Sequence, residues 1–327
     1  MKIYKYPKYV DNLLFLFKNC RIKKYNNKMN FDKFALPNNF EEKLPELKQR
    51  TLKWQTVYNS GTEINSSATI SFHEALGISP IGNLVLVPAL ATNSQIDPLM
   101  KSITYWGLTH KYNITNIDTF LSDFETEITP DNIKQFSYLE FKSLLHQTFK
   151  FIAPYTAKNT CVMAHCIGSV GVTGVFNDYI RNGEKLPVQS AVFFSPWPKM
   201  ASQRYDALKV LRNRIEKKNT TPDAVTKKKI QHMNFVSTLQ EFGLIMFDVK
   251  FEPEIICQWK IPVTFVAAGR DNIAPATRVC EKFNLLHKMP NGNYFKYLYL
   301  PGATHTFQNA YKDKNAIIKL IKNQRLR

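Results

Sequence analysis

From about residue 56 onward, short apolar runs alternate with longer stretches of helical pattern. This alternation is typical of βαβ units, in which parallel strands form one sheet and helices cover both of its faces. Several runs are almost continuously apolar, as expected of strands buried on both faces. The predicted strands are residues 68–72, 83–87, 112–117, 160–164, 190–194, 263–268 and 294–300; the main predicted helices are residues 131–153, 168–181, 274–287 and 309–322. We therefore predict an α/β domain with a mostly parallel central sheet.

Two regions break this alternation. Residues 1–55 are rich in Lys and Asn without a clear period, and we interpret them as an N-terminal extension with some helix, for example over residues 39–49. Met29 is an alternative start, which would place residues 1–28 outside the mature protein. The main domain is predicted over residues 56–327. Within it, residues 199–256 are charged and helical in pattern, which indicates a helical cap inserted between two strands. Its apolar residues fit either a lid over a substrate pocket or ordinary packing on the sheet.

The composition bears on partners and on location. The chain holds 44 Lys and Arg against 26 Asp and Glu, a net charge of +18. These charges are spread out and no nucleic-acid motif accompanies them, so we expect a solvated basic face and no specific nucleic-acid partner. The five cysteines are odd in number and form no C-x-x-C pair, which argues against a disulfide framework and against a zinc site. Free thiols suit a reducing compartment, and we expect a cytoplasmic protein without a membrane span.

The segment over residues 160–169 is the richest in chemical information. It leads from an apolar strand through Ala164, His165, Cys166 and Ile167 to Gly168, where a helix begins. A nucleophile on a sharp strand-to-helix turn needs small residues two positions before and after it, and Ala164 and Gly168 meet this requirement. The helix N-terminus supplies backbone N–H groups and a positive dipole end, which stabilise a thiolate. The pattern therefore predicts Cys166 as a nucleophile, whereas His165 is predicted to point away from it and to be structural.

This segment resembles the nucleophile elbow of the α/β-hydrolase superfamily, Gly-x-Ser-x-Gly, which often has His in the second place. Here Ala164 replaces the first glycine and Cys166 replaces the serine. The resemblance implies the α/β-hydrolase fold and a triad in the chain order nucleophile, acid, histidine. Asp271 follows the predicted strand 263–268 at the place of the acid. His305 follows the last predicted strand at the place of the base.

The resemblance also implies an oxyanion hole made of two backbone N–H groups. One belongs to Ile167, the residue after the nucleophile, and the other to Leu90 or Ala89 in the loop after strand 83–87. No metal and no cofactor is implied. Asp118 and Asp248, each of which follows an apolar run, are alternative acids. Cys161 and Cys280 are assigned to the core, and Cys257 is assigned a structural role.

A cysteine elbow narrows the expected chemistry, because an acyl-thioester is more reactive than an oxygen ester. Within the superfamily the chain resembles polyhydroxyalkanoate synthases at the elbow and at residues 86–90 and 271–275. It also resembles the cysteine-elbow hydrolase domains that are fused to cholesterol-oxidase-like flavoproteins. We expect an esterase or thioesterase that acts on a small molecule through a Cys-His-Asp triad and an acyl-thioester intermediate. The alternatives are an acyltransferase related to the synthases and a non-catalytic binding protein of the same fold.

Overall fold

The computed structural model describes residues 48–57, 63–74, 80–89, 98–117, 138–153, 159–197 and 251–307. The chain divides into two compact units, Met1–Phe34 and Ala35–Arg327, and all described residues belong to the second. Most of the predicted extension, residues 199–250 of the predicted cap and the predicted helix 309–322 lie outside the described residues. The same holds for Leu90 and for the alternative acids Asp118 and Asp248.

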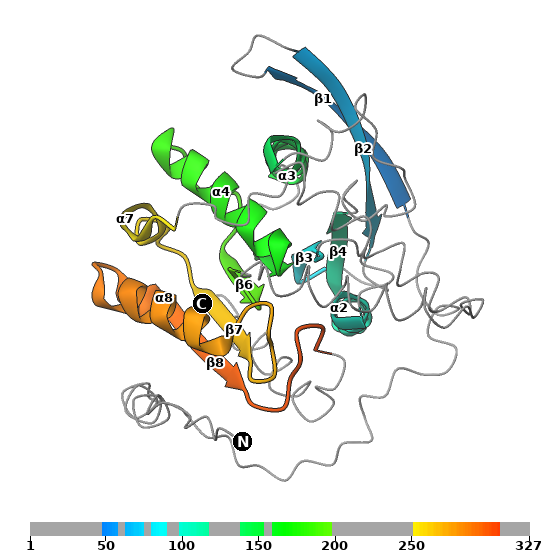
Figure 1. Ribbon diagram of the computed structural model, residues 1–327. Helices are drawn as coiled ribbons and strands as arrows, with labels where there is room; N and C mark the ends of the chain where they lie inside the picture. The colour runs from blue at the N-terminus through cyan, green and yellow to red at the C-terminus, as the bar shows by residue number, and fades with distance from the viewer. Residues whose placement is uncertain are drawn as a thin grey trace, which may run out of the picture. The chain divides into compact units, whose positions relative to one another are not determined.

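Within the described residues, eight strands form one sheet in the order β1-β2-β4-β3-β5-β6-β7-β8 (Figure 1). The strands are β1 (Lys48–Val57), β2 (Glu63–His73), β3 (Gly82–Val87), β4 (Tyr112–Ile117), β5 (Thr160–His165), β6 (Ser190–Phe194), β7 (Val263–Ala268) and β8 (Phe295–Leu300). Only the β1–β2 and β2–β4 pairs are antiparallel, and every pair from β4 to β8 is parallel. The predicted mostly parallel sheet is therefore confirmed.

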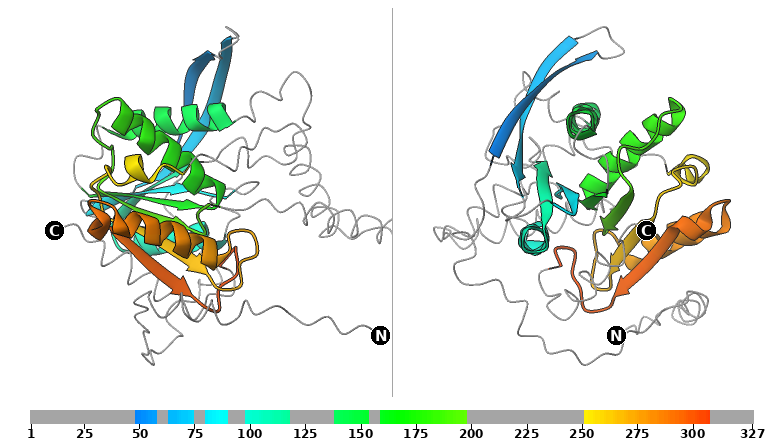
Figure 2. Two further views of the ribbon diagram at one scale, coloured as in Figure 1. Left: turned by 60° about the vertical axis from the view of Figure 1, so that its left-hand side comes forward. Right: turned by 180° about the vertical axis from the view of Figure 1, so that it is seen from behind.

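Helices cover both faces of this sheet (Figure 2). They are α2 (Pro98–Thr109), α3 (Tyr138–Ile152), α4 (Ile167–Arg181), the short α7 (Pro253–Ile256) and α8 (Ala276–Lys288). α2 lies on the opposite side of the sheet from α3, α4 and α8 (Figures 1 and 2). Successive residues of a strand point to opposite faces, and a strand with helices on both sides is apolar at nearly every position. β5, β6 and β7 are buried along their whole length for this reason.

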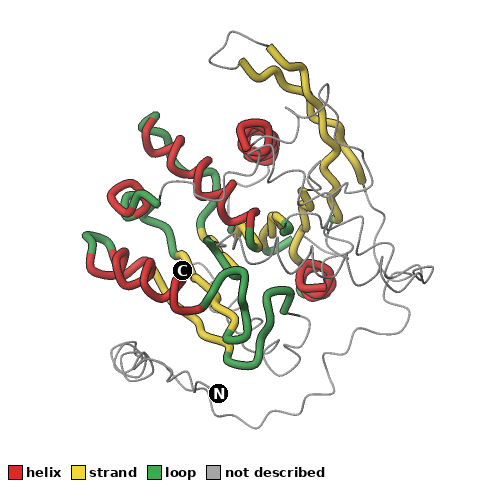
Figure 3. The backbone as a smooth tube through the Cα atoms, in the orientation of Figure 1, coloured by secondary structure: helices red, strands yellow, loops and turns green. Residues whose placement is uncertain are grey.

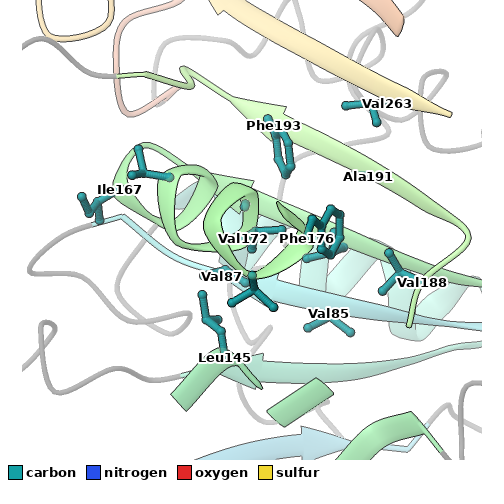
Figure 4. Close-up of a cluster of buried hydrophobic side chains, with 14 of the residues drawn as sticks. Val85, Val87, Leu145, Ile167, Val172, Phe176, Val188, Ala191, Phe193 and Val263 are labelled. Atoms are coloured by element: carbon teal, nitrogen blue, oxygen red, sulfur yellow. The ribbon is translucent and has the colours of Figure 1, made fainter. Parts of the chain in front are cut away.

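The larger core lies between the sheet and helices α3, α4 and α8 (Figure 4). Val172 and Phe176 of α4 pack there against Val85 and Val87 of β3, and Phe193 of β6 joins the same cluster. All of these side chains are completely buried, and burying one of this size contributes roughly 1.5–3 kcal/mol to folding. The core thereby fixes α4, and with it the turn between β5 and α4, relative to the sheet.

The first strand departs from the sequence-based expectation. β1 begins at Lys48, so the predicted boundary at residue 55 falls inside a strand, and the predicted helix over residues 39–49 is wrong at its last two residues. Leu52 and Trp54 of β1 are buried between exposed neighbours. The indole Nε1 of Trp54 donates to Glu140 Oε2 of α3 at 2.9 Å. This part of the predicted extension is therefore built into the sheet.

The described end of the predicted cap packs on the body of the domain. Glu252, just before α7, accepts a hydrogen bond from Asn177 of α4 at 3.3 Å and also pairs with Arg181. The ring of Phe251 contacts that of Trp197, with centroids 5.3 Å apart. The two residues that flank the segment 198–250, Trp197 and Phe251, are therefore in contact with each other. Among the described helices, none has the length and apolar character that crossing a membrane demands.

Candidate active site

The turn between β5 and α4 has the shape that its sequence predicts. Cys166 adopts φ 52° and ψ −117°, a left-handed conformation that side chains rarely take and that costs of the order of 1–3 kcal/mol. Its N–H donates to Phe194 O at 2.9 Å. Its carbonyl accepts from Ser169 N–H at 3.1 Å and from Ser169 Oγ at 2.6 Å. The neighbouring strand and the first turn of α4 together hold Cys166 at this sharp bend.

Gly168 brings the start of α4 against the end of β3. A Cβ atom at this position would lie 2.6 Å from Val87 O and 2.7 Å from Pro88 O, so no side chain fits here. The N-terminus of α4, where Ile167 lies, therefore sits next to the loop that holds Ala89. Ile167 and Ala89 are two of the three residues whose N–H groups we predicted as oxyanion donors. The third, Leu90, lies outside the described residues. The donor atoms themselves stay a prediction.

The four described cysteines are unlike in their settings, although all are buried and none forms a disulfide. Burial raises the pKa of the Cys161 thiol to about 12 and also raises the pKa of Cys257. Both agree with the predicted structural roles. Cys166 is 5% exposed and stands at the N-terminus of α4, where its thiol does not cap the helix. Helix N–H groups favour a thiolate at that position, whereas burial of the sulfur away from water opposes one.

Asp271 and His305 form a hydrogen-bonded pair. Asp271 follows β7 and His305 follows β8, in loops that lie side by side (Figure 3). These loops are tied together by Arg270 N–H, which donates to Ala303 O at 2.9 Å. His305 Nδ1 lies 2.8 Å from Asp271 Oδ2. A carboxylate only accepts hydrogen bonds, so Nδ1 carries the proton and a neutral ring has its lone pair on Nε2.

The Asp271 carboxylate is held as an anion in a buried place. Burial acts to raise its pKa, but hydrogen bonds and the charge of His305, together with bonds from Ser195 and the Ala274 N–H, bring the pKa below its usual range. The side chain has no exposed surface, whereas that of His305 is 13% exposed. A buried anion fixed by several donors orients a histidine and stabilises it when it becomes protonated.

His165 links the elbow to the loop of His305. Its Nε2 lies 2.8 Å from the carbonyl oxygen of His305, and the centroids of the two rings are 5.1 Å apart. The edge of Phe307 contacts the same ring of His165. The carboxyl ends of β5, β7 and β8 lie at one edge of the parallel sheet, and Cys166, Asp271 and His305 each follow one of these strands at that edge.

Two contacts of this site were not predicted from sequence. Ser195 Oγ donates to Asp271 Oδ2 at 2.6 Å, and His165, predicted only as structural, binds the backbone of His305. A small polar residue directly after a buried strand was the available signal for Ser195, since it places the hydroxyl at the carboxyl edge of the sheet. Nowhere in the described ranges do three or more His, Cys, Asp or Glu side chains gather to hold a metal ion.

No protein-family model and no curated protein matches the sequence, whereas solved structures resemble the fold. An esterase from Pyrococcus furiosus aligns with a TM-score of 0.53 at 11% identity, over 84% of this chain and 89% of that one. The peroxisomal alpha-beta-hydrolase Lpx1 from Saccharomyces cerevisiae gives 0.53 at 9% identity, over 86% and 88%. Rv0554 from Mycobacterium tuberculosis gives 0.51 at 13% identity, over 83% and 99%. With the strand order above, these likenesses confirm the α/β-hydrolase fold.

Proposed function

We propose that this α/β-hydrolase-fold protein hydrolyses an ester or thioester of a small molecule, with Cys166 as nucleophile. The supporting observation is the bond of 2.8 Å between His305 Nδ1 and Asp271 Oδ2, at the sheet edge where Cys166 adopts its left-handed turn. Nucleophile, acid and base follow the chain order of this fold. The relatives named as esterases and hydrolases agree with such a reaction, although their similarity concerns the fold.

The first half-reaction forms an acyl-enzyme. His305 Nε2 takes the proton of Cys166 Sγ, and the thiolate attacks the carbonyl carbon of the substrate. The carbonyl oxygen becomes an oxyanion, which the N–H of Ile167 and that of Ala89 or Leu90 stabilise. When the carbonyl forms again, the bond to the leaving alcohol or thiol breaks, and His305 returns its proton to that group. The acyl chain is then bound to Cys166 as a thioester.

The second half-reaction releases the acyl group. His305 removes a proton from a water molecule, whose oxygen attacks the thioester carbonyl. The tetrahedral intermediate then expels the Cys166 thiolate, which regains the proton from His305. If an alcohol or thiol acceptor takes the place of water, the same steps give an acyltransferase. We propose hydrolysis, and the test must distinguish it from acyl transfer to such an acceptor.

Intact-mass spectrometry after exposure to p-nitrophenyl butyrate tests the proposal on the full-length protein. We expect a single butyryl adduct that maps to Cys166 and decays as butyric acid appears. Cys166→Ala is expected to form no adduct, and His305→Gln to form it far more slowly. Cys161→Ala, which removes a buried thiol five residues earlier, is the matched control and is expected to behave like the wild type.

Each contrary result has a distinct meaning. An adduct on another residue, or one that forms equally fast without His305, would overturn the proposed triad. Butyryl transfer to an added alcohol in preference to water would replace hydrolysis with acyl transfer. If the folded wild-type protein forms no adduct with p-nitrophenyl butyrate or butyryl-CoA, the non-catalytic alternative takes the place of the enzyme.

A further inference from the structure

We propose that Ser195 is a positioning residue of this site, which shares Asp271 Oδ2 with His305 and thereby limits how strongly the carboxylate holds a proton on the imidazole. The role rests on the proposed triad of Cys166, His305 and Asp271. Ser195 acts through Asp271 and is not itself placed against a substrate. Its hydroxyl binds the carboxylate oxygen that also binds His305, so that it tunes the base indirectly.

The hydrogen bonds of Asp271 define this role. Oδ1 accepts two backbone N–H groups, that of Ile273 at 2.8 Å and that of Ala274 at 2.9 Å. Oδ2 accepts Ser195 Oγ–H at 2.6 Å and His305 Nδ1–H at 2.8 Å. Both oxygens therefore accept two donors. Because an ionised carboxylate has no proton to give, the serine must be the donor in its bond.

The backbone around Ser195 directs the hydroxyl to this place. Ser195 follows β6, is completely buried and adopts a φ of 45°, which is unusual for a residue with a side chain. Its N–H donates to Val266 O of β7 at 2.8 Å, which ties the turn to the strand that leads to Asp271. A buried polar residue in a strained conformation is costly unless the surrounding structure fixes it. Here the bond to Asp271 satisfies the buried hydroxyl.

Sharing one oxygen divides its negative charge between two donors. A hydrogen bond to an anion is stronger than one between neutral groups, and it draws charge toward the donor. With Ser195 in place, Oδ2 therefore stabilises a protonated His305 less than an oxygen bound to His305 alone. The two backbone bonds to Oδ1 keep the carboxylate in position when the hydroxyl is removed. The main effect of losing Ser195 is thus on charge, while the bond between Asp271 and His305 persists.

Among the described residues, titratable side chains contact His305 from two other elements. Asp271 approaches from the loop after β7, and His165 approaches from the end of β5. Cys166 is the next residue of the elbow, and its thiol is the proposed partner of the imidazole. A titration of His305 must therefore remove the thiol, so that the proton equilibrium of the histidine is read without that of the nucleophile.

The test is an NMR titration of labelled histidine side chains in full-length protein with the background substitution Cys166→Ala. The His305 signals are assigned by their loss in His305→Gln. We expect Ser195→Ala to move the titration midpoint of His305 upward by about half a pH unit or more. Ser190→Ala, which truncates another completely buried serine at the start of β6, is the matched control and should leave the midpoint in place.

An unchanged or lowered midpoint in Ser195→Ala would overturn the proposal. If the alanine variant does not fold, Ser195→Cys keeps the site filled with a weaker donor, and a smaller upward shift is expected; no shift there also overturns it. The titration requires no turnover. The two proposals can therefore fail separately. If the protein forms no acyl adduct, the proposed function is contradicted, and an upward shift of the His305 midpoint would still support the role of Ser195.

Discussion

His165 Nε2 lies 2.8 Å from the carbonyl oxygen of His305, so the residue just before the elbow cysteine binds the backbone of the proposed base. Because a carbonyl only accepts, His165 must carry a proton on Nε2. The bond joins the end of β5 to the loop after β8, two segments 140 residues apart in the chain. It fixes the distance between the two loops on which the proposed chemistry depends.

His165→Phe is expected to keep a buried ring and to remove this donor. We predict a loss of about 1 kcal/mol in the free energy of unfolding, because the carbonyl of His305 loses one partner. The rate of acyl-adduct formation on Cys166 should fall about tenfold, as the base loop is held less firmly. His165→Gln can still donate to the carbonyl and should lie closer to the wild type. Equal adduct rates in the wild type and the phenylalanine variant would contradict the link.

Thiol alkylation should distinguish the cysteines. Because the pKa of Cys161 is raised to about 12, only about one molecule in ten thousand carries its thiolate at pH 8. In the folded protein, iodoacetamide is therefore expected to modify Cys166 well before Cys161, as peptide mapping would detect. In urea the two should react at similar rates. Preferential modification of Cys161 in the folded state would contradict the assignment of the reactive thiol.

Gly168→Ala should damage both the fold and the site. The added methyl group would press on the carbonyl oxygens of Val87 and Pro88, which cannot move without disturbing β3. We expect a loss of about 2–3 kcal/mol in stability, measured by urea unfolding. The shift of Ile167 away from the β3 loop should also slow acyl-adduct formation. A variant with wild-type stability and adduct rate would show that the start of α4 does not need this close approach.

Asp178 should contribute stability that depends on pH. Burial acts to raise its pKa, but hydrogen bonds from His146 and Lys142 bring the pKa below its usual value. A carboxyl whose pKa is lowered in the folded state stabilises the fold above its unfolded pKa of about 3.9, and this contribution is lost as the pH falls through the folded pKa. Asp178→Asn should therefore cost about 1 kcal/mol at pH 7 and much less at pH 3. Urea midpoints at the two pH values measure the difference.

The exposed Glu184 offers a control for this titration. Glu184→Gln removes a carboxyl from the same region of the chain and leaves in place the contacts of Asp178 in α4 with Lys142 and His146 in α3. Its stability relative to the wild type should change little between the two pH values. An Asp178→Asn deficit that stays constant from pH 7 to pH 3 would argue that the carboxylate charge contributes nothing to the packing of these helices.

Trp54→Phe tests whether β1 belongs to the folded domain. The substitution keeps most of the buried ring and removes the indole N–H that Glu140 accepts. Because Glu140 is completely buried, the loss of a donor to its carboxyl should cost about 1–3 kcal/mol. Glu140→Gln retains an acceptor oxygen and should cost less. If Trp54→Phe leaves the urea midpoint unchanged, β1 does not share in the cooperative unfolding of the domain.

Much of this arrangement could be predicted because its signals are local. β5 is buried on both faces and reads as a continuous apolar run, and the turn after it demands small residues around Cys166. The places of Asp271 and His305 followed from their positions after predicted strands and from a resemblance in chain order. Local sequence therefore predicted the parallel sheet and the elbow turn, whereas the candidate triad was predicted from the resemblance together with these strand positions.

Other features depend on partners that are distant along the chain, and only the tertiary structure decided them. β1 alternates buried and exposed residues, but its sequence alone resembles that of a polar extension. Its place in the sheet depends on pairing with β2 and on the hydrogen bond to Glu140. In the sequence Ser195 looks like an ordinary turn residue, because Asp271, which accepts the hydrogen bond of its hydroxyl, lies 76 positions later in the chain. His165 likewise reaches the carbonyl of His305 only when the loop after β8 has packed against the end of β5. A hydrogen bond between distant segments leaves no periodic trace in a sequence, because its geometry exists only after both segments have been packed.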